Sequence, residues 1–247
     1  MKKLFFVLPF LIAIQNINAQ TEVLKETGSW FTFTNNVKLS DKFYFGNVSQ
    51  MRRVDFMDDI KIVLLRPSLN YKINSNITVG MGYMFFRAYP NGVVHASITK
   101  GETRFWQHIT LKSSVGKTKF YNRFIFEYRF KDVINTEVTP NIIDGTTYAQ
   151  RFRYRLLATF NLFKLKNNNY ILGKVSNELR IKFKTGLSQP DFDQNNLYAY
   201  IGYKLFDNSK AWIGYGRNYF KKSEGTYLSE DILQVALSYD FDVSKKK

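Results

Sequence analysis

Residues 119–130 read Lys-Phe-Tyr-Asn-Arg-Phe-Ile-Phe-Glu-Tyr-Arg-Phe, and this stretch decides the fold. Its side chains alternate between an aromatic set (Phe120, Phe124, Phe126, Tyr128 and Phe130) and a mainly polar set (Tyr121, Arg123, Ile125, Glu127 and Arg129). A period of two residues is that of a β-strand, whose successive side chains point to opposite faces. An Arg or Lys that faced the middle of a bilayer would cost about 2 to 4 kcal/mol. We therefore expect the aromatic face to meet lipid and the charged face to line the inside of a β-barrel.

Further stretches repeat this alternation. Their outward side chains would be Phe152, Tyr154, Leu156, Ala158, Phe160, Val175, Leu179, Ile181, Phe183, Leu233, Val235, Leu237, Tyr239 and Phe241. The pattern gives eleven candidate strands, at 28–39, 43–53, 60–73, 77–88, 101–113, 118–131, 147–161, 170–184, 195–206, 210–221 and 231–242. Short turns alternate with longer loops at 89–100, 132–146, 184–194 and 221–230. Alternating turn lengths are typical of outer-membrane barrels.

The predicted fold is an all-β, antiparallel, up-and-down transmembrane β-barrel. Bacterial barrels made from one chain usually have an even number of strands. We therefore expect about twelve strands, with ten as the second choice, and a strand in Thr21–Thr27 would supply the twelfth. An eleven-strand barrel would leave the N-terminus on the long-loop side, because the first turn, Ser40-Asp41-Lys42, is short.

The candidate functional site is the set of charged residues on the inward faces. Its members are Arg66, Glu102, Arg104, Arg123, Glu127, Arg129, Arg151, Arg153, Arg155, Lys174, Glu178 and Arg180. With Lys72, Lys112 and Lys182, the predicted interior holds twelve basic and three acidic residues, so the lumen should be strongly electropositive. Buried charges persist only when paired. If Val115-Gly116 form a hairpin tip, Arg104 lies directly opposite Glu127, whereas a register two residues away places Arg104 opposite Arg129.

The N-terminus predicts export. Met1-Lys2-Lys3 precedes an apolar run from Leu4 to Ile14, and Asn18-Ala19-Gln20 follows. The run is shorter than the roughly 20 residues of a transmembrane helix, which is typical of a secretory signal peptide. We expect residues 1–19 to be a cleaved signal peptide and residues 20–247 to be the barrel domain. The expected location is the outer membrane of a Gram-negative bacterium.

The composition excludes several kinds of site. The net charge of +16 comes from basic residues spread through the strands, and export also argues against nucleic acid as a partner. No cysteine and two histidines leave no zinc site. The expected loop acids, Asp55, Asp58, Asp59, Asp191 and Asp193, match no defined calcium motif. We expect no metal and no cofactor, and as partners outer-membrane lipid and either small anionic solutes or lipopolysaccharide.

Several short motifs resemble the DUF2490 family of uncharacterised outer-membrane barrels, which is common in Bacteroidetes. They are Arg66-Pro67 with Tyr71, Glu102-Thr103-Arg104-Phe105-Trp106-Gln107, Arg123 with Glu127-Tyr128-Arg129-Phe130, Arg151-Phe152-Arg153-Tyr154 and Phe192-Asp193-Gln194-Asn195. The resemblance implies a barrel with Arg/Glu-rich strands, and it implies no reaction. The junction Asn18-Ala19-Gln20 is similar to Bacteroidetes signal-peptide junctions.

We expect no enzyme, but a barrel whose lumen either binds or conducts small anions or forms a structural, salt-bridged interior. One alternative is a membrane-embedded lipid hydrolase. His95-Ala96-Ser97 and Arg104-Phe105-Trp106-Gln107 are similar to His-x-Ser and Arg-x-Trp-Asn elements of outer-membrane phospholipase A, with Gln107 in place of Asn. Another is a soluble periplasmic lipid carrier, because alternating strands also build soluble barrels. His108 is expected to be a hydrogen-bonded residue of the lumen, and the tryptophans Trp30, Trp106 and Trp212 are expected in the lumen or in interfacial girdles.

Overall fold

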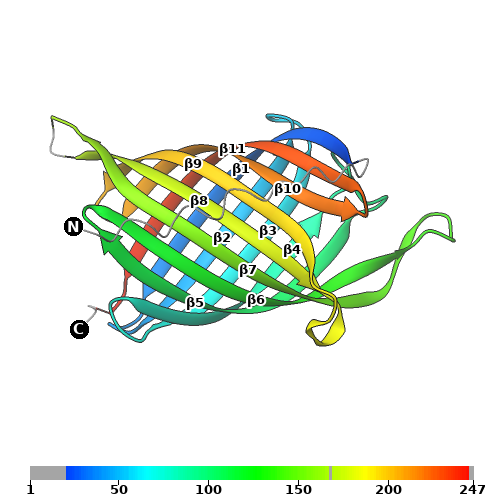
Figure 1. Cartoon of the computed structure of the whole chain (residues 1–247), viewed down its shortest axis with the longest axis horizontal. Helices are drawn as coiled ribbons and strands as arrows, with labels where there is room; N and C mark the ends of the chain where they lie inside the picture. Colours follow the sequence, from blue (N-terminus) through cyan, green and yellow to red (C-terminus); the bar gives the residue numbers. More distant parts are fainter. Residues whose placement is uncertain (1–20, 167–168, 245–247) are drawn as a thin grey trace, which may run out of the picture.

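The chain forms one closed β-barrel in a computed structural model that describes residues 21–166 and 169–244 (Figure 1). The strands are β1 (Glu22–Lys38), β2 (Phe43–Val54), β3 (Ile60–Lys72), β4 (Ile77–Ala88), β5 (Lys100–Val115), β6 (Thr118–Asn135), β7 (Ile142–Lys164), β8 (Tyr170–Phe183), β9 (Asp191–Phe206), β10 (Ser209–Ser223) and β11 (Thr226–Asp242). A short 3-10 helix, η1 (Thr185–Leu187), lies between β8 and β9. The predicted signal peptide, residues 1–19, lies outside the described residues.

The barrel closes through a parallel pair of strands. Each strand pairs antiparallel with the next along the chain, and β1 then pairs parallel with β11. Parallel closure follows from the odd count, because the first and last of eleven alternating strands run in the same direction. The predicted all-β barrel is confirmed, and its eleven described strands lie between the predicted twelve and ten. The proposed extra strand at Thr21–Thr27 is instead the start of β1.

The two ends of the barrel differ in their connections. Short turns at 39–42, 73–76, 116–117 and 207–208, with the β7–β8 connection, mark the short-turn end. The connections at 55–59, 89–99, 136–141, 184–190 and 224–225 mark the long-loop end. The predicted loop at 221–230 is wrong, because β10 and β11 are joined by only two residues, with Gly225 at φ 73°. β1 begins at the long-loop end and β11 finishes at the short-turn end (Figure 1).

The two faces of the wall separate apolar from charged side chains as predicted. On β7, Arg151 and Arg153 are buried inside, while Leu156 is 38% exposed on the outside. On β8, Glu178 is buried and Leu179 is exposed. The alternation therefore gives an apolar outer wall and a charged interior. Within the described residues, no helix has the length and hydropathy needed to cross a bilayer.

Apolar side chains also fill part of the lumen. One buried cluster contains Leu64, Met84, Trp106 and Ile125, and a second contains Trp30, Tyr198 and Ile232. Glycine makes room for the largest of these rings, since a Cβ at Gly82 would lie 2.6 Å from a ring carbon of Trp106. Trp30 and Trp106 are thus lumen residues rather than girdle residues.

The predicted register of the β5–β6 hairpin is wrong. Val115 pairs with Thr118, so the turn is Gly116-Lys117 rather than Val115-Gly116. Gly116 has φ 57°, and two-residue hairpins favour glycine because their first turn position has positive φ. Arg104 consequently lies opposite Arg129, and Glu127 lies opposite Trp106. The assumption that failed was that unlike charges must be directly opposed across this hairpin, because the ion pairs between β5 and β6, Glu102–Arg129 and Arg104–Glu127, are diagonal.

Candidate functional site

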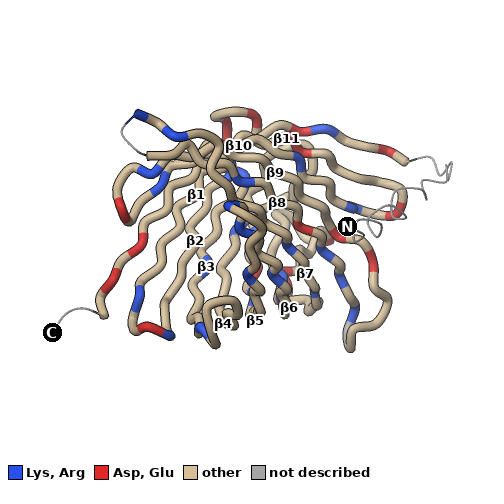
Figure 2. Tube along the Cα trace, turned by 60° about the vertical axis from the view of Figure 1, so that its left-hand side comes forward, with Lys and Arg blue, Asp and Glu red and all other residues tan. Residues whose placement is uncertain are grey.

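Charged side chains are concentrated inside one half of the barrel wall. β1 and β2 carry Lys, Arg, Asp and Glu only near their ends, whereas β6, β7 and β8 carry them along much of their length (Figure 2). Three pairs of arginines lie directly opposite each other on neighbouring strands. These pairs are Arg104/Arg129, Arg123/Arg155 and Arg153/Arg180. Opposed like charges repel, so each pair destabilises the barrel unless a nearby carboxylate offsets the repulsion.

Glu102 bridges the first pair. Its Oε1 accepts hydrogen bonds from Arg104 Nε at 2.6 Å and from Arg129 Nε at 2.5 Å. Its Oε2 accepts a third from Arg129 Nη2 at 3.0 Å. One carboxylate thus offsets the repulsion between two guanidinium groups.

Glu127 is the centre of the network and is 0% exposed. It accepts two hydrogen bonds from Arg151, from Nε at 2.8 Å and from Nη2 at 2.6 Å, and another from Arg153 Nη1. Nitrogens of Arg66 and Arg104 lie 3.8 Å from its carboxylate oxygens. Four arginines from β3, β5 and β7 therefore converge on one buried charge of β6, which links these strands through the lumen.

Glu178 bridges Arg153 and Arg180, the pair that joins β7 to β8. Its two oxygens each lie 2.8 Å from Arg153 Nη2, and Oε1 accepts a hydrogen bond from Arg180 Nε at 2.7 Å. Arg153 therefore donates to both Glu127 and Glu178. The predicted residues on these strands form one continuous network of ion pairs.

Arg123 and Arg155 form the remaining pair, and no acid bridges them. Neither forms an ion pair with, or donates a hydrogen bond to, any residue in the described part of the chain, and the Nε atoms of both are buried without a partner. Arg66 Nε is also buried without a partner, and its guanidinium lies 4.0 Å from the centre of the Trp106 ring. The Arg123 guanidinium lies 5.4 Å from the same ring. Stacking on Trp106 holds these cations in place but does not neutralise them.

Lys174 is not part of the ion-pair network. Its ammonium lies 3.9 Å from the centre of the Tyr200 ring and 4.4 Å from that of Trp212. The structure thus brings eleven of the twelve predicted site residues into the network or its unbridged arginine pair, and it places Lys174 among aromatic rings nearby.

A second ion-pair cluster was not predicted from the sequence. Glu26 of β1 lies opposite Glu230 of β11, and Lys61 bridges them with distances of 2.5 and 2.8 Å. All three side chains are buried. The predicted strands at 28–39 and 231–242 began too late to include the two glutamates. The alternation of the sequence could have identified both glutamates, because each lies an even number of residues from the inward-facing side chains of its strand.

The acids expected in a loop before the ninth strand belong to the barrel wall. β9 begins at Asp191, so Asp191 and Asp193 are strand residues and the loop prediction is wrong. Asp193 Oδ2 accepts a hydrogen bond from Arg151 Nη1 at 2.8 Å. Asp191 pairs with Lys182 at 3.2 Å and with Lys221 at 3.1 Å. These carboxylates are engaged by cations of the wall.

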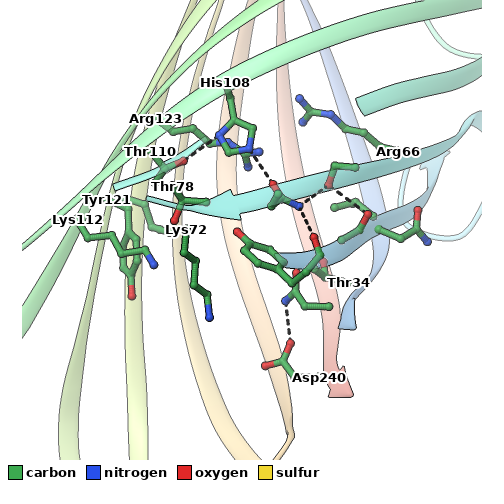
Figure 3. Close-up of a pocket in the computed structure, with 18 of the residues that line it drawn as sticks. Thr34, Arg66, Lys72, Thr78, His108, Thr110, Lys112, Tyr121, Arg123 and Asp240 are labelled. Atoms are coloured by element: carbon green, nitrogen blue, oxygen red, sulfur yellow. Dashed lines mark hydrogen bonds between the residues drawn. The ribbon is translucent and has the colours of Figure 1, made fainter. Parts of the chain in front are cut away.

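A basic cavity opens at the short-turn end, and we call it the vestibule (Figure 3). Its volume is about 460 Å³. The Lys and Arg residues that line it are Lys38, Arg66, Lys72, Lys112, Arg123 and Arg155. Asp240 is the acidic residue among its described lining residues, and it accepts a hydrogen bond from Asn36 at 2.7 Å. Lys38 pairs with Asp41 and Asp242, and Arg66 lies 3.8 Å from Glu127. The other four cations, Lys72, Lys112, Arg123 and Arg155, have no ion-pair partner among the described residues and leave this half of the lumen positively charged.

Residues 27–229 match the model of a protein family described as Protein of unknown function (DUF2490). The chain belongs to the DUF2490 family. Neither a curated protein nor a solved structure matches this DUF2490 chain. The predicted resemblance is confirmed, and the match covers β2 to β10 completely.

The two histidines of this DUF2490 chain have different surroundings. His108 is buried, stacks on Trp106 and contacts Asn70 Oδ1 through Nε2 at 2.9 Å and Thr110 Oγ1 through Nδ1 at 3.2 Å. The prediction of a hydrogen-bonded lumen residue is confirmed. His95 Nδ1 lies 2.8 Å from the Ala96 carbonyl oxygen, and the Ser97 hydroxyl accepts a hydrogen bond from Asn141. Within the described residues no hydrogen bond joins His95 to Ser97, so this geometry does not assemble a nucleophile with its base.

Proposed function

We propose that this protein is an integral outer-membrane barrel that binds small anions in the vestibule from the periplasmic side. One observation carries the proposal: six Lys and Arg residues face one cavity that has a single acidic residue in its described lining. Guanidinium groups form strong, bidentate hydrogen bonds with oxyanions. A basic cavity in which Arg123 and Arg155 form no ion pair with a described residue is therefore suited to an anionic ligand.

The outer wall supports membrane embedding. Ile201, Ile213 and Val235 form an apolar row across β9, β10 and β11, and they are 57%, 54% and 40% exposed. Such a contiguous apolar surface is unusual on a protein surrounded by water. The short turns of outer-membrane barrels face the periplasm. In that orientation the vestibule opens to the periplasm.

The middle of the lumen favours a binding barrel over a wide pore. Glu127, Arg151 and Arg153 are 0%, 3% and 6% exposed, and apolar clusters pack beside them. Moving this network aside would separate several buried ion pairs, which is strongly unfavourable. We propose that the interior is both the structural frame of the barrel and the floor of the anion site.

We expect the full-length protein, expressed in a Gram-negative host, to fractionate with the outer membrane. It should require detergent for extraction, because its apolar wall would be covered by lipid. Refolded protein should give no ohmic porin-like conductance in planar bilayers. Recovery in the soluble periplasmic fraction would favour the lipid-carrier alternative, and a large steady conductance would contradict a packed lumen.

The proposed role is binding rather than catalysis, and lipid hydrolysis provides a direct test. We expect refolded protein in mixed phospholipid–detergent micelles to release no fatty acid above background. Release that Ser97→Ala abolished, with the barrel still folded on a heat-modifiability gel, would instead favour the hydrolase.

A further inference from the structure

Opposed like charges inside this barrel follow a pattern. Glu102 bridges Arg104 and Arg129, Glu178 bridges Arg153 and Arg180, and Lys61 bridges the opposed glutamates Glu26 and Glu230. In each case the third residue carries the opposite charge and lies within 2.8 Å of both members. The fold thus tolerates paired like charges where it supplies a bridging counter-charge.

The pair Arg123/Arg155 departs from this pattern. The two residues are directly opposite on β6 and β7, and both line the vestibule. Glu178 lies across from Arg155 on β8, but its hydrogen bonds go to Arg153 and Arg180. Among the described residues, no carboxylate forms a hydrogen bond or an ion pair with Arg123 or Arg155.

We infer that a phosphate group, either free or carried on a small organic molecule, binds between Arg123 and Arg155 as the missing bridge. The inference rests on the proposed anion-binding function and specifies its site and ligand chemistry. A phosphate dianion can offset both guanidinium charges, and its oxygens accept from several N–H groups at once. Arg66, whose Nε and Nη2 are buried without hydrogen-bond partners, provides a third donor group on the same cavity.

The shape of the vestibule indicates where the rest of a larger ligand would lie. Arg66, Arg123 and His108 lie toward one end of the cavity, and Lys72 and Asp240 lie toward the other (Figure 3). Tyr44 and Tyr121 also line the cavity. A volume of about 460 Å³ exceeds the space that one phosphate group needs, so an organic portion would fit beside the tyrosines.

The experiment is calorimetric titration of detergent-refolded, full-length protein with inorganic phosphate and, in separate titrations, with phenyl phosphate, sulfate and acetate. Arg123→Gln and Arg155→Gln should each weaken binding at least tenfold, because each removes one bidentate donor. Arg87→Gln is the matched control, since Arg87 is exposed on the outward face of β4 and should leave affinity unchanged. Arg123→Lys should give an intermediate loss, because lysine keeps the charge but cannot bind bidentately.

Folding provides a second readout of the same variants. Saturating phosphate should raise the unfolding midpoint of the wild type, because the ligand binds only the folded state. That increase should disappear in Arg123→Gln and Arg155→Gln. Without phosphate, these two variants should be at least as stable as the wild type, because each substitution removes the opposed like charge.

The outcomes separate the inference from the proposed function. Tighter binding of phenyl phosphate would identify a carried phosphate group, and equal binding would identify free phosphate. If phosphate binds the wild type and both glutamine variants equally, the inference is wrong and the anion-binding function stands. If the wild type binds sulfate or acetate but neither phosphate compound, the inferred phosphate site is wrong and the anion-binding function stands. If it binds none of these anions, both the inferred phosphate site and the proposed anion-binding function are wrong.

Discussion

Glu127→Gln should lower the free energy of unfolding by about 3 to 5 kcal/mol, the usual cost of breaking a buried ion pair by removing one partner. Glutamine keeps the size of the side chain but removes the negative charge that holds Arg151 and Arg153. Those two arginines are 3% and 6% exposed, so water cannot replace the lost carboxylate, and each keeps a single carboxylate partner, Asp193 for Arg151 and Glu178 for Arg153. Since Arg66 and Arg104 also lie 3.8 Å from the carboxylate, we place the expected loss at the upper end of the range.

The loss can be measured by urea unfolding of protein refolded into lipid vesicles, followed by tryptophan fluorescence. Glu137→Gln is the matched control, because Glu137 is an exposed residue in the connection between β6 and β7 and should leave the unfolding midpoint unchanged. Adding Arg66→Met to Glu127→Gln should restore part of the stability, because Glu127 is the only carboxylate among the described residues that forms an ion pair with Arg66. Equal midpoints for Glu127→Gln and Glu137→Gln would refute the role of Glu127 as the centre of the network.

The barrel could be predicted from the sequence because its wall has a strict period of two. Residues 119–130 alone separate the outward rings from the inward charges, and every neighbouring strand continues that division. The closure of the barrel could not be predicted in the same way. Whether β1 and β11 pair directly depends on the curvature of the whole sheet, which no local pattern encodes.

The members of the site could be predicted, but their partners could not. Period-two alternation identifies Arg104, Glu127 and Arg129 as inward residues whatever the register. The register itself depends on the turn, and Gly116 moved the turn by one residue relative to the prediction. Arginine side chains are long enough to reach a diagonal carboxylate, so charge complementarity did not select one register. Charge complementarity also does not predict the unbridged pair, because the observed pairing of β6 with β7 is what places Arg123 opposite Arg155.

Strand ends were the other source of error, and they explain the missed cluster. Lys61 could be seen as a strand residue, but its partners Glu26 and Glu230 lay outside the predicted strands by one or two residues. Outer-membrane strands can extend beyond the bilayer, where alternation includes polar residues on both faces and the pattern weakens. The pattern therefore predicts the middle of each strand better than its end at the long-loop side.

Val235→Arg should separate a membrane barrel from a soluble one by a large margin. Val235 is 40% exposed on the outer face of β11, between Phe31 of β1 and Ile213 of β10. In a bilayer the arginine would face acyl chains, and the expected loss of unfolding free energy in lipid vesicles is about 2 to 4 kcal/mol. On a wall that faced water, an exposed arginine would change stability by no more than about 0.5 kcal/mol.

Val93→Arg makes the same chemical change where no membrane is expected. Val93 is 54% exposed in the connection between β4 and β5, so its arginine should be solvated and the unfolding midpoint should not move. Both variants replace valine with arginine, so the intrinsic difference between these two residues contributes about equally to both unfolding free energies. The difference between the two variants therefore reports the environment of the outer wall. If both variants unfold at the wild-type urea concentration, lipid does not cover β11, and the periplasmic orientation of the vestibule loses its basis. If Val235→Arg alone is destabilised, the wall is buried in the bilayer and ligands can reach Arg123 and Arg155 only through the ends of the barrel.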